Sequence, residues 1–518
     1  MVWKPELDEL KHREALAEQM GGREGIEKQH ARGKLTVRER IDKLTDPGSF
    51  QEIGKLAGVA TYEDDQLISV RPAPIITGIG TIDGRKVALS GGDFTIRGGA
   101  ADANIGNKSS YMLRLAEQWH LPYITLLDAT GGSVRTFEHI GRTYIPDTND
   151  YCAVNGRLLN IVPVVAAVLG SVAGLPAVQA CISHFNVMVK GISQIFPGGP
   201  PVVKAALGYD ITKEELGDER TQVIESGVVD NLAESEEEAF AMIKRFLSYL
   251  PSNVWEMPPR IEPQDDPGRR EEKLLTVIPR KSTRGYNPHQ ILKYILDQDS
   301  LFEIAPLYGR SRITAFARVN GYPVGVMINN PSYLGGSMDV AAGNKVIRFL
   351  QLCNTFHLPM VYFADEPGFM VGLEAQKQGI VRAGAKMVLA TCATTMPWIT
   401  FIIRQLYGVA GQNHKRPGGM YKRVAWPSGN WGSMHIAGGA AAAYRREIES
   451  APDPEAKLKE IEKRLDAVAS PFRSAEAFDI EEIIDPRDTR PILCDFIEMA
   501  QAMIKTQLGP TTGPGYWP

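Results

Sequence analysis

The sequence predicts an α/β protein in which one whole domain is written twice. The segments "GGAADANIGNK" (Gly98–Lys108) and "GGSMDVAAGNK" (Gly335–Lys345) share the pattern G-G-x-x-D-x-x-x-G-N-K and lie 237 positions apart. Solenoid repeats have periods of roughly 20–50 residues, so a period this long indicates a duplicated domain. In each copy, apolar strand-like runs alternate with helical patterns, and a proline-rich segment separates the two copies.

The same offset, applied without a gap, matches further residues. The matched pairs include "HLP" at 120–122 with "HLP" at 357–359, Asp128 with Asp365, Gly131 with Gly368, and "VAG" at 172–174 with "VAG" at 409–411. These matches span the centre of both copies. We therefore expect the two domains to correspond element by element.

Three buried strands are expected in each copy, at 86–92, 123–128 and 161–170 in the first and at 323–330, 360–365 and 398–408 in the second. "GIGTIDG" (78–84) is typical of a hairpin turn before the first of these strands. A helix carrying the G-N-K sequence follows the Gly-Gly loop. Strands alternating with helices at this spacing indicate β-α-β crossovers and buried, largely parallel sheets. Amphipathic surface helices are expected to end the two copies, at 234–250 and 454–469.

The segment Pro251–Pro288 holds seven prolines and many charges, which is typical of a linker. We therefore predict a first domain at residues 1–255, a linker at 256–285 and a second domain at 286–518. A chain of 518 residues is long enough for two domains that each bury a core.

Composition narrows the class of protein. Apolar residues make up 43% and charged residues 23% of the chain, as in soluble globular proteins. The net charge of −4, without a dense Lys/Arg run, argues against nucleic acid or an anionic membrane as partner. The five scattered cysteines form no C-x-x-C, so we expect a reduced, cytoplasmic protein. No signal-peptide pattern is expected at the start, and no apolar stretch is long enough for a membrane span.

The last buried strand of each copy ends in small residues, in "VLGSVAGLPAVQACI" and "RQLYGVAGQNHK". Pro176 suits the first turn of a helix, where backbone N–H groups lack internal partners. Small residues let a ligand oxygen approach those N–H groups, so the pattern predicts a backbone oxyanion hole in each copy. Close packing of strand on helix is the alternative interpretation. No metal-ligand spacing, G-x-S-x-G elbow or acid/base pair was found, which suits chemistry whose reactants supply their own bases.

Several longer motifs carry a family resemblance. They are "ARGKLTVRERIDKLTDPGSF" (31–50), "DFTIRGG" (93–99), "HFNVMVKGISQIFPGGPPVVKAALG" (184–208), "EELG" (214–217), "RFLSYLPSN" (245–253), "DEPGF" (365–369) and "AWP" (425–427). Through them the chain resembles the carboxyltransferase (β) subunit of biotin-dependent acyl-CoA carboxylases, the propionyl-CoA group. The resemblance implies two tandem crotonase-like domains built of β-β-α spiral repeats. It also implies a homohexamer in which the first domain of one subunit faces the second domain of another.

The resemblance assigns the site residues. The first oxyanion hole falls on Ala173, Gly174 and Leu175, and the second on Tyr407, Gly408, Val409 and Ala410. Catalytic roles are expected for Gly174, Leu175, Val409 and Ala410, and substrate contacts for Ala173, Gly131, Gly132, Gly408 and Gln412. Gly411 and Gln412 occupy a region that tunes acyl-chain choice in relatives. Leu175 and Val409 depart from the family, which usually has glycine at both positions, and residues 128–142 depart as well.

The resemblance also implies the reaction. An acyl-CoA thioester would bind mainly to the first domain and carboxybiotin mainly to the second, with no metal. The biotin ureido nitrogen would take the α-proton, and the resulting enolate would attack CO₂. No biotin-attachment motif is present, so a biotin carboxylase and a biotin carboxyl carrier are expected on other chains. The alternatives are the carboxyltransferase component of a malonyl-type acyl-CoA decarboxylase or transcarboxylase, and a non-catalytic scaffold of the family.

Overall fold

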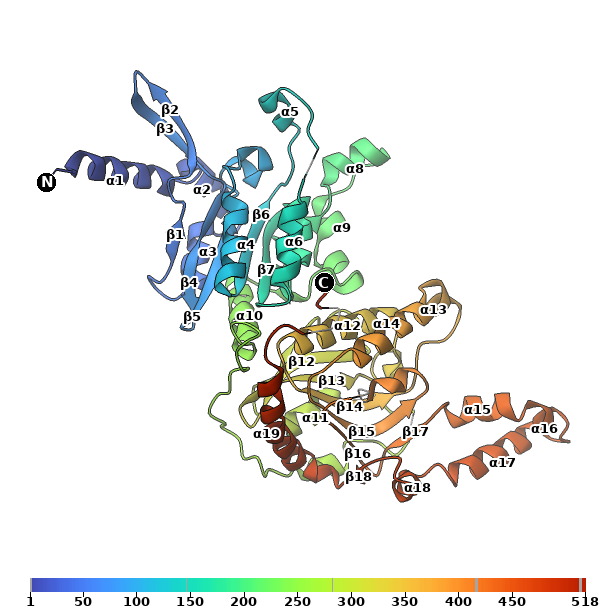
Figure 1. Cartoon of the computed structure of the whole chain (residues 1–518). Helices are drawn as coiled ribbons and strands as arrows, with labels where there is room; N and C mark the ends of the chain where they lie inside the picture. Colours follow the sequence, from blue (N-terminus) through green and yellow to red (C-terminus); the bar gives the residue numbers. More distant parts are fainter. Residues whose placement is uncertain (1, 146, 282, 415–417, 512–514) are drawn as a thin grey trace. The chain divides into compact units, whose positions relative to one another are not determined.

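The computed structural model describes residues 2–145, 147–281, 283–414, 418–511 and 515–518. By its internal contacts the chain divides into two compact units, Met1–Glu256 with Trp517–Pro518 and Met257–Tyr516 (Figure 1). We call them the first and second unit. Each contains one eight-stranded sheet covered by helices.

The sheet of the first unit has the strand order β1-β4-β5-β6-β7-β8-β10, and β9 pairs with β7. The strands are β1 (Gln51–Ile53), β4 (Ile75–Ile82), β5 (Arg85–Gly92), β6 (Tyr123–Ala129), β7 (Val164–Ala173), β8 (Phe185–Val189), β9 (Gln194–Phe196) and β10 (Asn231–Ala233). β1, β4 and β5 pair antiparallel, and the pairs from β5 onward are parallel. The expected hairpin joins β4 to β5, and the Asp46 carboxylate accepts hydrogen bonds from the N–H groups of Asp83 and Gly84 in its turn.

Helices cover this sheet in two pairs. α3 (Val37–Leu44) packs on α10 (Glu236–Tyr249), and both contact the strands. α4 (Lys108–Trp119) packs on α6 (Asn149–Leu158) and on β4 and β5. The remaining helices and one separate hairpin are α1 (Lys4–Glu18), α2 (Gly22–His30), α5 (Arg135–Ile140), α7 (Leu175–Cys181), α8 (Pro200–Leu207), α9 (Lys213–Gly217), β2 (Gly58–Glu63) and β3 (Gln66–Pro72).

The second unit repeats this plan, with the order β11-β12-β13-β14-β15-β16-β18 and β17 paired with β15. Its strands are β11 (Phe302–Glu303), β12 (Arg312–Val319), β13 (Tyr322–Asn329), β14 (Met360–Glu366), β15 (Trp398–Tyr407), β16 (Tyr421–Ala425), β17 (Asn430–Gly432) and β18 (Glu482–Ile483). Its helices are α11 (Pro288–Ile295), α12 (Val340–Thr355), α13 (Leu373–Lys377), α14 (Ile380–Cys392), α15 (Ile436–Ala443), α16 (Arg445–Glu449), α17 (Pro454–Asp466), α18 (Pro471–Glu476) and α19 (Thr489–Gln507). The predicted duplication of an α/β domain is confirmed.

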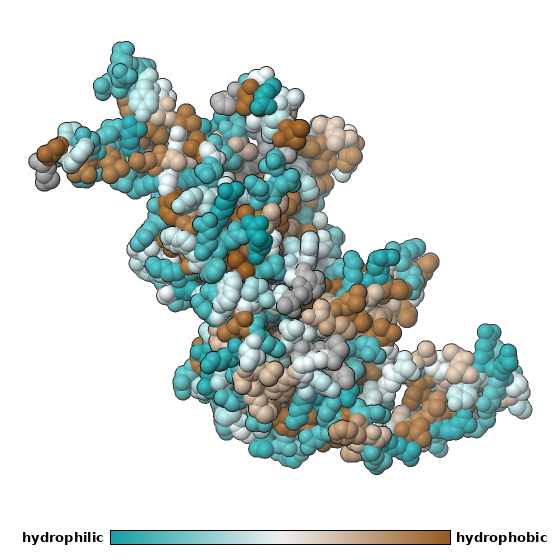
Figure 2. All heavy atoms as spheres, in the orientation of Figure 1, coloured by the Kyte–Doolittle hydropathy of each residue, from teal (hydrophilic) through white to brown (hydrophobic). Residues whose placement is uncertain are grey.

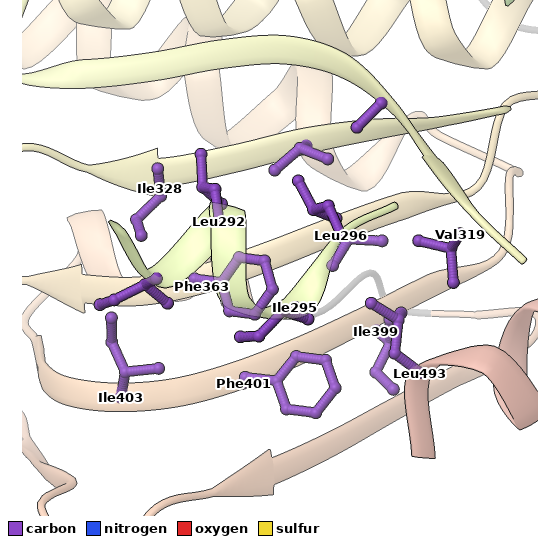
Figure 3. Packing of buried hydrophobic residues seen from close by; sticks show 14 of the residues in the cluster. Leu292, Ile295, Leu296, Val319, Ile328, Phe363, Ile399, Phe401, Ile403 and Leu493 are labelled. Atoms are coloured by element: carbon purple, nitrogen blue, oxygen red, sulfur yellow. The ribbon is translucent and has the colours of Figure 1, made fainter. Parts of the chain in front are cut away.

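The core of the second unit lies between its sheet and two helices, α11 and α19 (Figure 3). Leu292 and Ile295 from α11 and Leu493 from α19 are fully buried there. The rings of Phe363 and Phe401, on neighbouring strands, stack with centroids 5.4 Å apart. Burying a side chain of this size contributes about 1.5–3 kcal/mol, so these residues hold β14 and β15 firmly in place.

Strand register corrects the ungapped alignment of the two copies. Tyr123 pairs with Val164, whereas its counterpart Met360 pairs with Trp398, so β7 and β15 are offset by 234 positions. The match of "VAG" with "VAG" is therefore wrong, and Gly174 corresponds to Gly408. The connection from β14 to β15 is three residues shorter than the connection from β6 to β7, and the strands themselves correspond residue by residue.

Both helices expected near the ends of the copies are present, as α10 and α17. α10 packs on α3, and in the second unit α19, which follows α17 in the chain, is buried with α11. α17 buries only Ile461 among its described residues and belongs to a longer excursion, α15 to α18, between β17 and β18. α17 and α19 both combine apolar and charged residues, and packing decides which of them enters the core.

From Met257 onward, the described residues of the proline-rich segment belong to the second unit. Leu274 lies in the core of that unit. Arg318 Nη1 donates a 2.9 Å hydrogen bond to Pro259 O, and Arg404 Nη1 donates a 2.8 Å hydrogen bond to Arg284 O. These contacts hold Pro259, Leu274 and Arg284 against the second unit, so this part of the segment contributes to its surface.

Candidate functional site

The first candidate site lies where β7 gives way to α7. Gly174 joins them with φ 67° and ψ −134°, a conformation that glycine adopts readily. Its own N–H donates to Phe196 O (3.3 Å) and Pro197 O (3.1 Å) and is not available to a ligand. The next N–H, of Leu175, donates to no described residue, and Leu175 is 40% exposed. Leu175 N–H is thus a backbone donor without an acceptor among the described residues, on a partly exposed residue.

A glycine loop after β6 lies against this strand end. Gly131 has φ 78°, and a Cβ placed on it would overlap the Ala173 carbonyl oxygen. A Cβ on Gly174 would lie 3.8 Å from the Gly132 nitrogen. The structure thus brings together Ala173, Gly174, Gly131 and Gly132, with Leu175 following directly.

The second candidate site repeats this geometry at the end of β15. Gly408 has φ 64°, and its N–H donates a 3.1 Å hydrogen bond to Gly432 O. The following Val409 is 60% exposed, and in the described part of the chain its N–H has no acceptor. Gly368, the counterpart of Gly131, faces the same strand end, since a Cβ on it would lie 4.0 Å from Tyr407 O.

The other predicted residues of the second site are buried or have their N–H engaged. Ala410 is fully buried, so its N–H does not reach the surface. Gln412 is exposed, and its N–H donates a 3.0 Å hydrogen bond to Val409 O. Among these described residues, Val409 is the exposed one whose N–H has no acceptor, and it is the candidate donor of the second strand end.

A buried ion cluster that sequence reasoning missed supports the first strand end. The fully buried Asp128 accepts hydrogen bonds from Lys34 Nζ (2.7 Å), Arg40 Nη1 (3.1 Å) and Gln29 Nε2 (3.0 Å). A Cβ on Gly170 would overlap the Asp128 carboxylate, so only glycine fits there. Burial lowers the pKa of Lys34, and the neighbouring Asp128 opposes this. The signal available in the sequence was the pair of Gly170 and Asp128 at adjacent strand ends.

The second unit keeps the carboxylate and changes its partners. Asp365 accepts hydrogen bonds from Tyr286 Oη (2.9 Å), Arg404 Nε (3.2 Å) and Gln405 N (3.1 Å). Burial raises the pKa of Asp365, and the Arg404 guanidinium opposes this. Strand register places Arg404 where the first unit has Gly170.

A cavity of about 660 Å³ adjoins the second strand end. Its lining includes Tyr407, Arg404, His435, Asp466 and Arg280, the last from the proline-rich segment. The ring of His435 meets that of Tyr407 edge-on, with centroids 5.3 Å apart. Burial, reinforced by Asp466, raises the pKa of Tyr407, so its hydroxyl stays protonated at neutral pH. The cavity offers charged and aromatic contacts next to Tyr407, two residues before Val409.

Two further findings concern the described residues only. No three His, Cys, Asp or Glu side chains there lie together in a way that could hold a metal ion. No helix there combines the length and the apolar composition needed to cross a membrane.

A family model described as "Carboxyl transferase domain" matches residues 28–509 of the chain. The chain belongs to the carboxyl transferase family. This confirms the resemblance expected from the sequence and makes the protein a transferase enzyme.

Curated relatives agree in function and length. The carboxyltransferase subunit of propionyl-CoA carboxylase from Haloferax mediterranei is 32% identical over 513 residues, which cover 98% of each chain. The alpha subunit of methylmalonyl-CoA decarboxylase from Veillonella parvula is 32% identical over 489 residues, which cover 92% of each chain. Full-length similarity therefore extends to carboxyl transferases that run in both directions.

A solved structure of the transcarboxylase 12S, a hexamer with methylmalonyl-coenzyme A and methylmalonic acid bound, is similar with a TM-score of 0.86. It is 30% identical, and the match covers 96% of this chain and 95% of that chain. With the two matching sheets, this confirms the predicted pair of tandem crotonase-like domains in this carboxyl transferase.

Proposed function

We propose that this protein is the carboxyltransferase component of a biotin-dependent acyl-CoA carboxylase. The observation that carries the proposal is the pair of free donors, Leu175 N–H and Val409 N–H, at corresponding strand ends of two copies of one domain. Membership of the carboxyl transferase family and the names of the relatives support the choice of reaction.

The first site would act on the acyl thioester. Its carbonyl oxygen becomes more negative as the α-proton leaves, and Leu175 N–H would donate a hydrogen bond that strengthens at that moment. A fixed donor that binds the transition state better than the ground state lowers the barrier. Gly131, packed against Ala173, would keep the site free of side chains and hold its shape.

The second site would hold the biotin head group. When bound, carboxybiotin supplies CO₂ and a ureido nitrogen that accepts the α-proton. Val409 N–H would donate to the ureido oxygen, and the neighbouring cavity with Tyr407 and Arg404 would orient the group. Gly408 would contribute by exposing the Val409 peptide.

Partners and assembly follow from the same proposal. The biotin carboxylase and the biotin carboxyl carrier are other chains, and the protein acts in the cytoplasm. Self-association into a hexamer, as in the transcarboxylase 12S, would place active sites where subunits meet. Hydrophobic side chains exposed over α8 and over α13 and α14 suit such contacts (Figure 2); they include Val202, Leu207, Leu373, Val381 and Leu389.

A decarboxylase or transcarboxylase component remains the second candidate, because relatives of both kinds match along nearly the whole chain. The same donors stabilise the enolate during carboxylation and decarboxylation. The direction of the reaction therefore depends on the biotin-carrying partner and on the acceptor of the carboxyl group. The accessible donors do not favour a non-catalytic scaffold.

The test uses the purified full chain with free biotin and either methylmalonyl-CoA or malonyl-CoA. Biotin-dependent loss of CO₂ is expected. Its absence with every dicarboxylic acyl-CoA would contradict the proposal. Gly131→Ala should reduce the rate about 10²-fold, because the new Cβ pushes the loop away from Ala173. Gly84→Ala is the matched control, since Gly84 also has φ 78° but faces open space in a hairpin away from the site.

A further inference from the structure

The second unit contains a buried ion pair at the end of its sheet, in addition to the Asp365 cluster. Arg312, the first residue of β12, and Glu366, the last residue of β14, are 1% and 0% exposed. Arg312 Nη2 donates to Glu366 Oε2, and Asn329 Nδ2 donates to the same oxygen at 3.2 Å. Arg312 Nε and Nη1 have no hydrogen-bond partner among the described residues. A buried, incompletely satisfied pair is weak evidence for stability, so another role is indicated.

The first unit shows that the fold does not need this pair. Ile75 pairs with Gly92 across β4 and β5, as Arg312 pairs with Asn329 across β12 and β13. Ala129 ends β6 as Glu366 ends β14. Apolar or small residues thus occupy all three corresponding places, and the first unit keeps the same strand pairing.

The second carboxylate oxygen of Glu366, Oε1, indicates that role. Glu366 Oε1 accepts a 3.1 Å hydrogen bond from Gly368 N–H, in the loop that faces the second strand end. Gly368 O in turn accepts from Met338 N at 3.0 Å. One carboxylate therefore connects the buried arginine to the glycine loop.

The two units hold their glycine loops differently. In the first, Gly131 lies so close to Ala173 O that no Cβ would fit, and direct packing fixes the loop. In the second, a Cβ on Gly368 would lie 4.0 Å from Tyr407 O, so packing is looser. Both loops also make a backbone bond, Met338 N–H to Gly368 O here and Ala101 N–H to Gly131 O in the first unit. The hydrogen bond from Gly368 N–H to Glu366 adds a constraint for which the first unit, with Ala129, has no side chain. Burial raises the pKa of Glu366 and the Arg312 guanidinium opposes this, so Arg312 favours the charged form, to which a hydrogen bond is stronger.

We propose that Glu366, fixed by Arg312, is a positioning residue for the second strand-end site: it holds the Gly368 loop in register with the Val409 donor. Glu366 is fully buried and acts through the Gly368 peptide. The inference rests on the proposed function for its kinetic consequence, because the second site is the one assigned to biotin. Small displacements of such donors reduce catalysis strongly.

The test removes the pair without leaving a buried charge. Arg312→Ile with Glu366→Ala copies the residues of the first unit, and Arg312→Ile with Glu366→Gln keeps an oxygen that can accept from Gly368 N–H. The alanine form should raise the KM for free biotin, or lower kcat, about tenfold, and leave the KM for methylmalonyl-CoA unchanged. The glutamine form should restore most of the loss.

Hydrogen exchange provides a readout that does not depend on the reaction. Amide exchange in the peptide that covers Gly368 should accelerate in the alanine form, and exchange around Gly131 should stay as in the wild type. Arg38→Ala with Glu52→Ala removes a partly exposed pair of the first unit (2.9 Å) and should change neither the biotin KM nor exchange at Gly368. If the alanine form does not fold, Arg312→Ile with Glu366→Met is used in its place. Methionine fills more of the space left by the Glu366 side chain than alanine does.

The outcomes separate the two proposals. Unchanged exchange around Gly368 in a folded variant overturns the positioning role, whatever the kinetics. If exchange accelerates and the biotin kinetics do not change, the pair only stabilises the loop, and the positioning role is likewise overturned. If the wild type shows no biotin-dependent turnover, the proposed function fails, and the exchange result alone decides whether Glu366 orders the loop.

Discussion

The two units bury the same carboxylate and neutralise it in different ways. Asp128 takes its cations from Lys34 and Arg40, which precede the sheet in the chain, whereas Asp365 takes Arg404 from the neighbouring strand. Where Arg404 stands, the first unit has Gly170, which leaves space for Lys34 Nζ. The fold therefore demands a paired carboxylate at this strand end but does not dictate the origin of its cation.

Breaking the first cluster should have the largest effect. Arg40→Met leaves Asp128 and Glu236 buried without their shared guanidinium and should lower the free energy of unfolding by about 3–5 kcal/mol. Chemical denaturation of the full chain measures this loss. Lys43→Met on the same helix breaks only the exposed pair with Glu237 and should cost less than about 1 kcal/mol. Equal losses for the two variants would contradict the role assigned to the cluster.

Removing a backbone donor should have the next largest effect. Leu175→Pro deletes the free N–H at the first position of α7, where proline is tolerated, and should reduce kcat by about 10²–10³-fold. Leu175→Ala keeps the N–H and should stay within about tenfold of the wild type, in the assay with free biotin. A proline variant that remains folded and fully active would show that Leu175 N–H is not the donor.

Filling the space at Gly170 should have a moderate effect. Gly170→Ala puts a Cβ into the Asp128 carboxylate and should destabilise the protein by about 1–3 kcal/mol. Thermal unfolding checks this. Gly156→Ala, within α6 and facing open space, should be neutral or stabilising by up to about 1 kcal/mol, so only Gly170→Ala should lower the melting temperature.

The smallest effect concerns an ion pair that both units keep. Arg38 pairs with Glu52 (2.9 Å) in the first unit, and His289 pairs with Glu303 (2.6 Å) in the second, each joining a helix to an edge strand. The hydrogen bond to Glu303 raises the pKa of His289. The pair therefore stabilises the fold fully below the unfolded pKa and loses its contribution as the pH rises through the folded value.

His289→Arg should remove this pH dependence and make the second unit resemble the first. The expected difference between about pH 6 and about pH 9 is below about 1 kcal/mol, because both side chains are partly exposed. Denaturation curves of the wild type and the variant at both pH values measure this difference in the free energy of unfolding. A wild-type contribution that grows with pH would contradict the assignment.

Local patterns predicted the elements that position the site, and non-local packing decided the rest. Alternating strands and the strand-end glycines Gly174 and Gly408 were visible in the sequence, because backbone conformation leaves a local signature. The three-residue shift between β7 and β15 was not visible, because "VAG" happens to occur at 172–174 and at 409–411, which fits the ungapped offset. The pairing of Arg312 with Glu366 was invisible, since an isolated charge in a sequence looks solvated until the strands bring it inside. The choice of α19 as core helix likewise depended on packing.

The position of the proline-rich segment has a practical consequence for dividing the protein. Leu274 sits in the second core, and Arg280 lines the cavity beside Tyr407. A recombinant fragment that starts at the first strand of the second unit would lack one wall of that cavity and part of its hydrophobic interior. A fragment meant to hold the second strand-end site on its own should therefore begin no later than Met257, where the second unit starts.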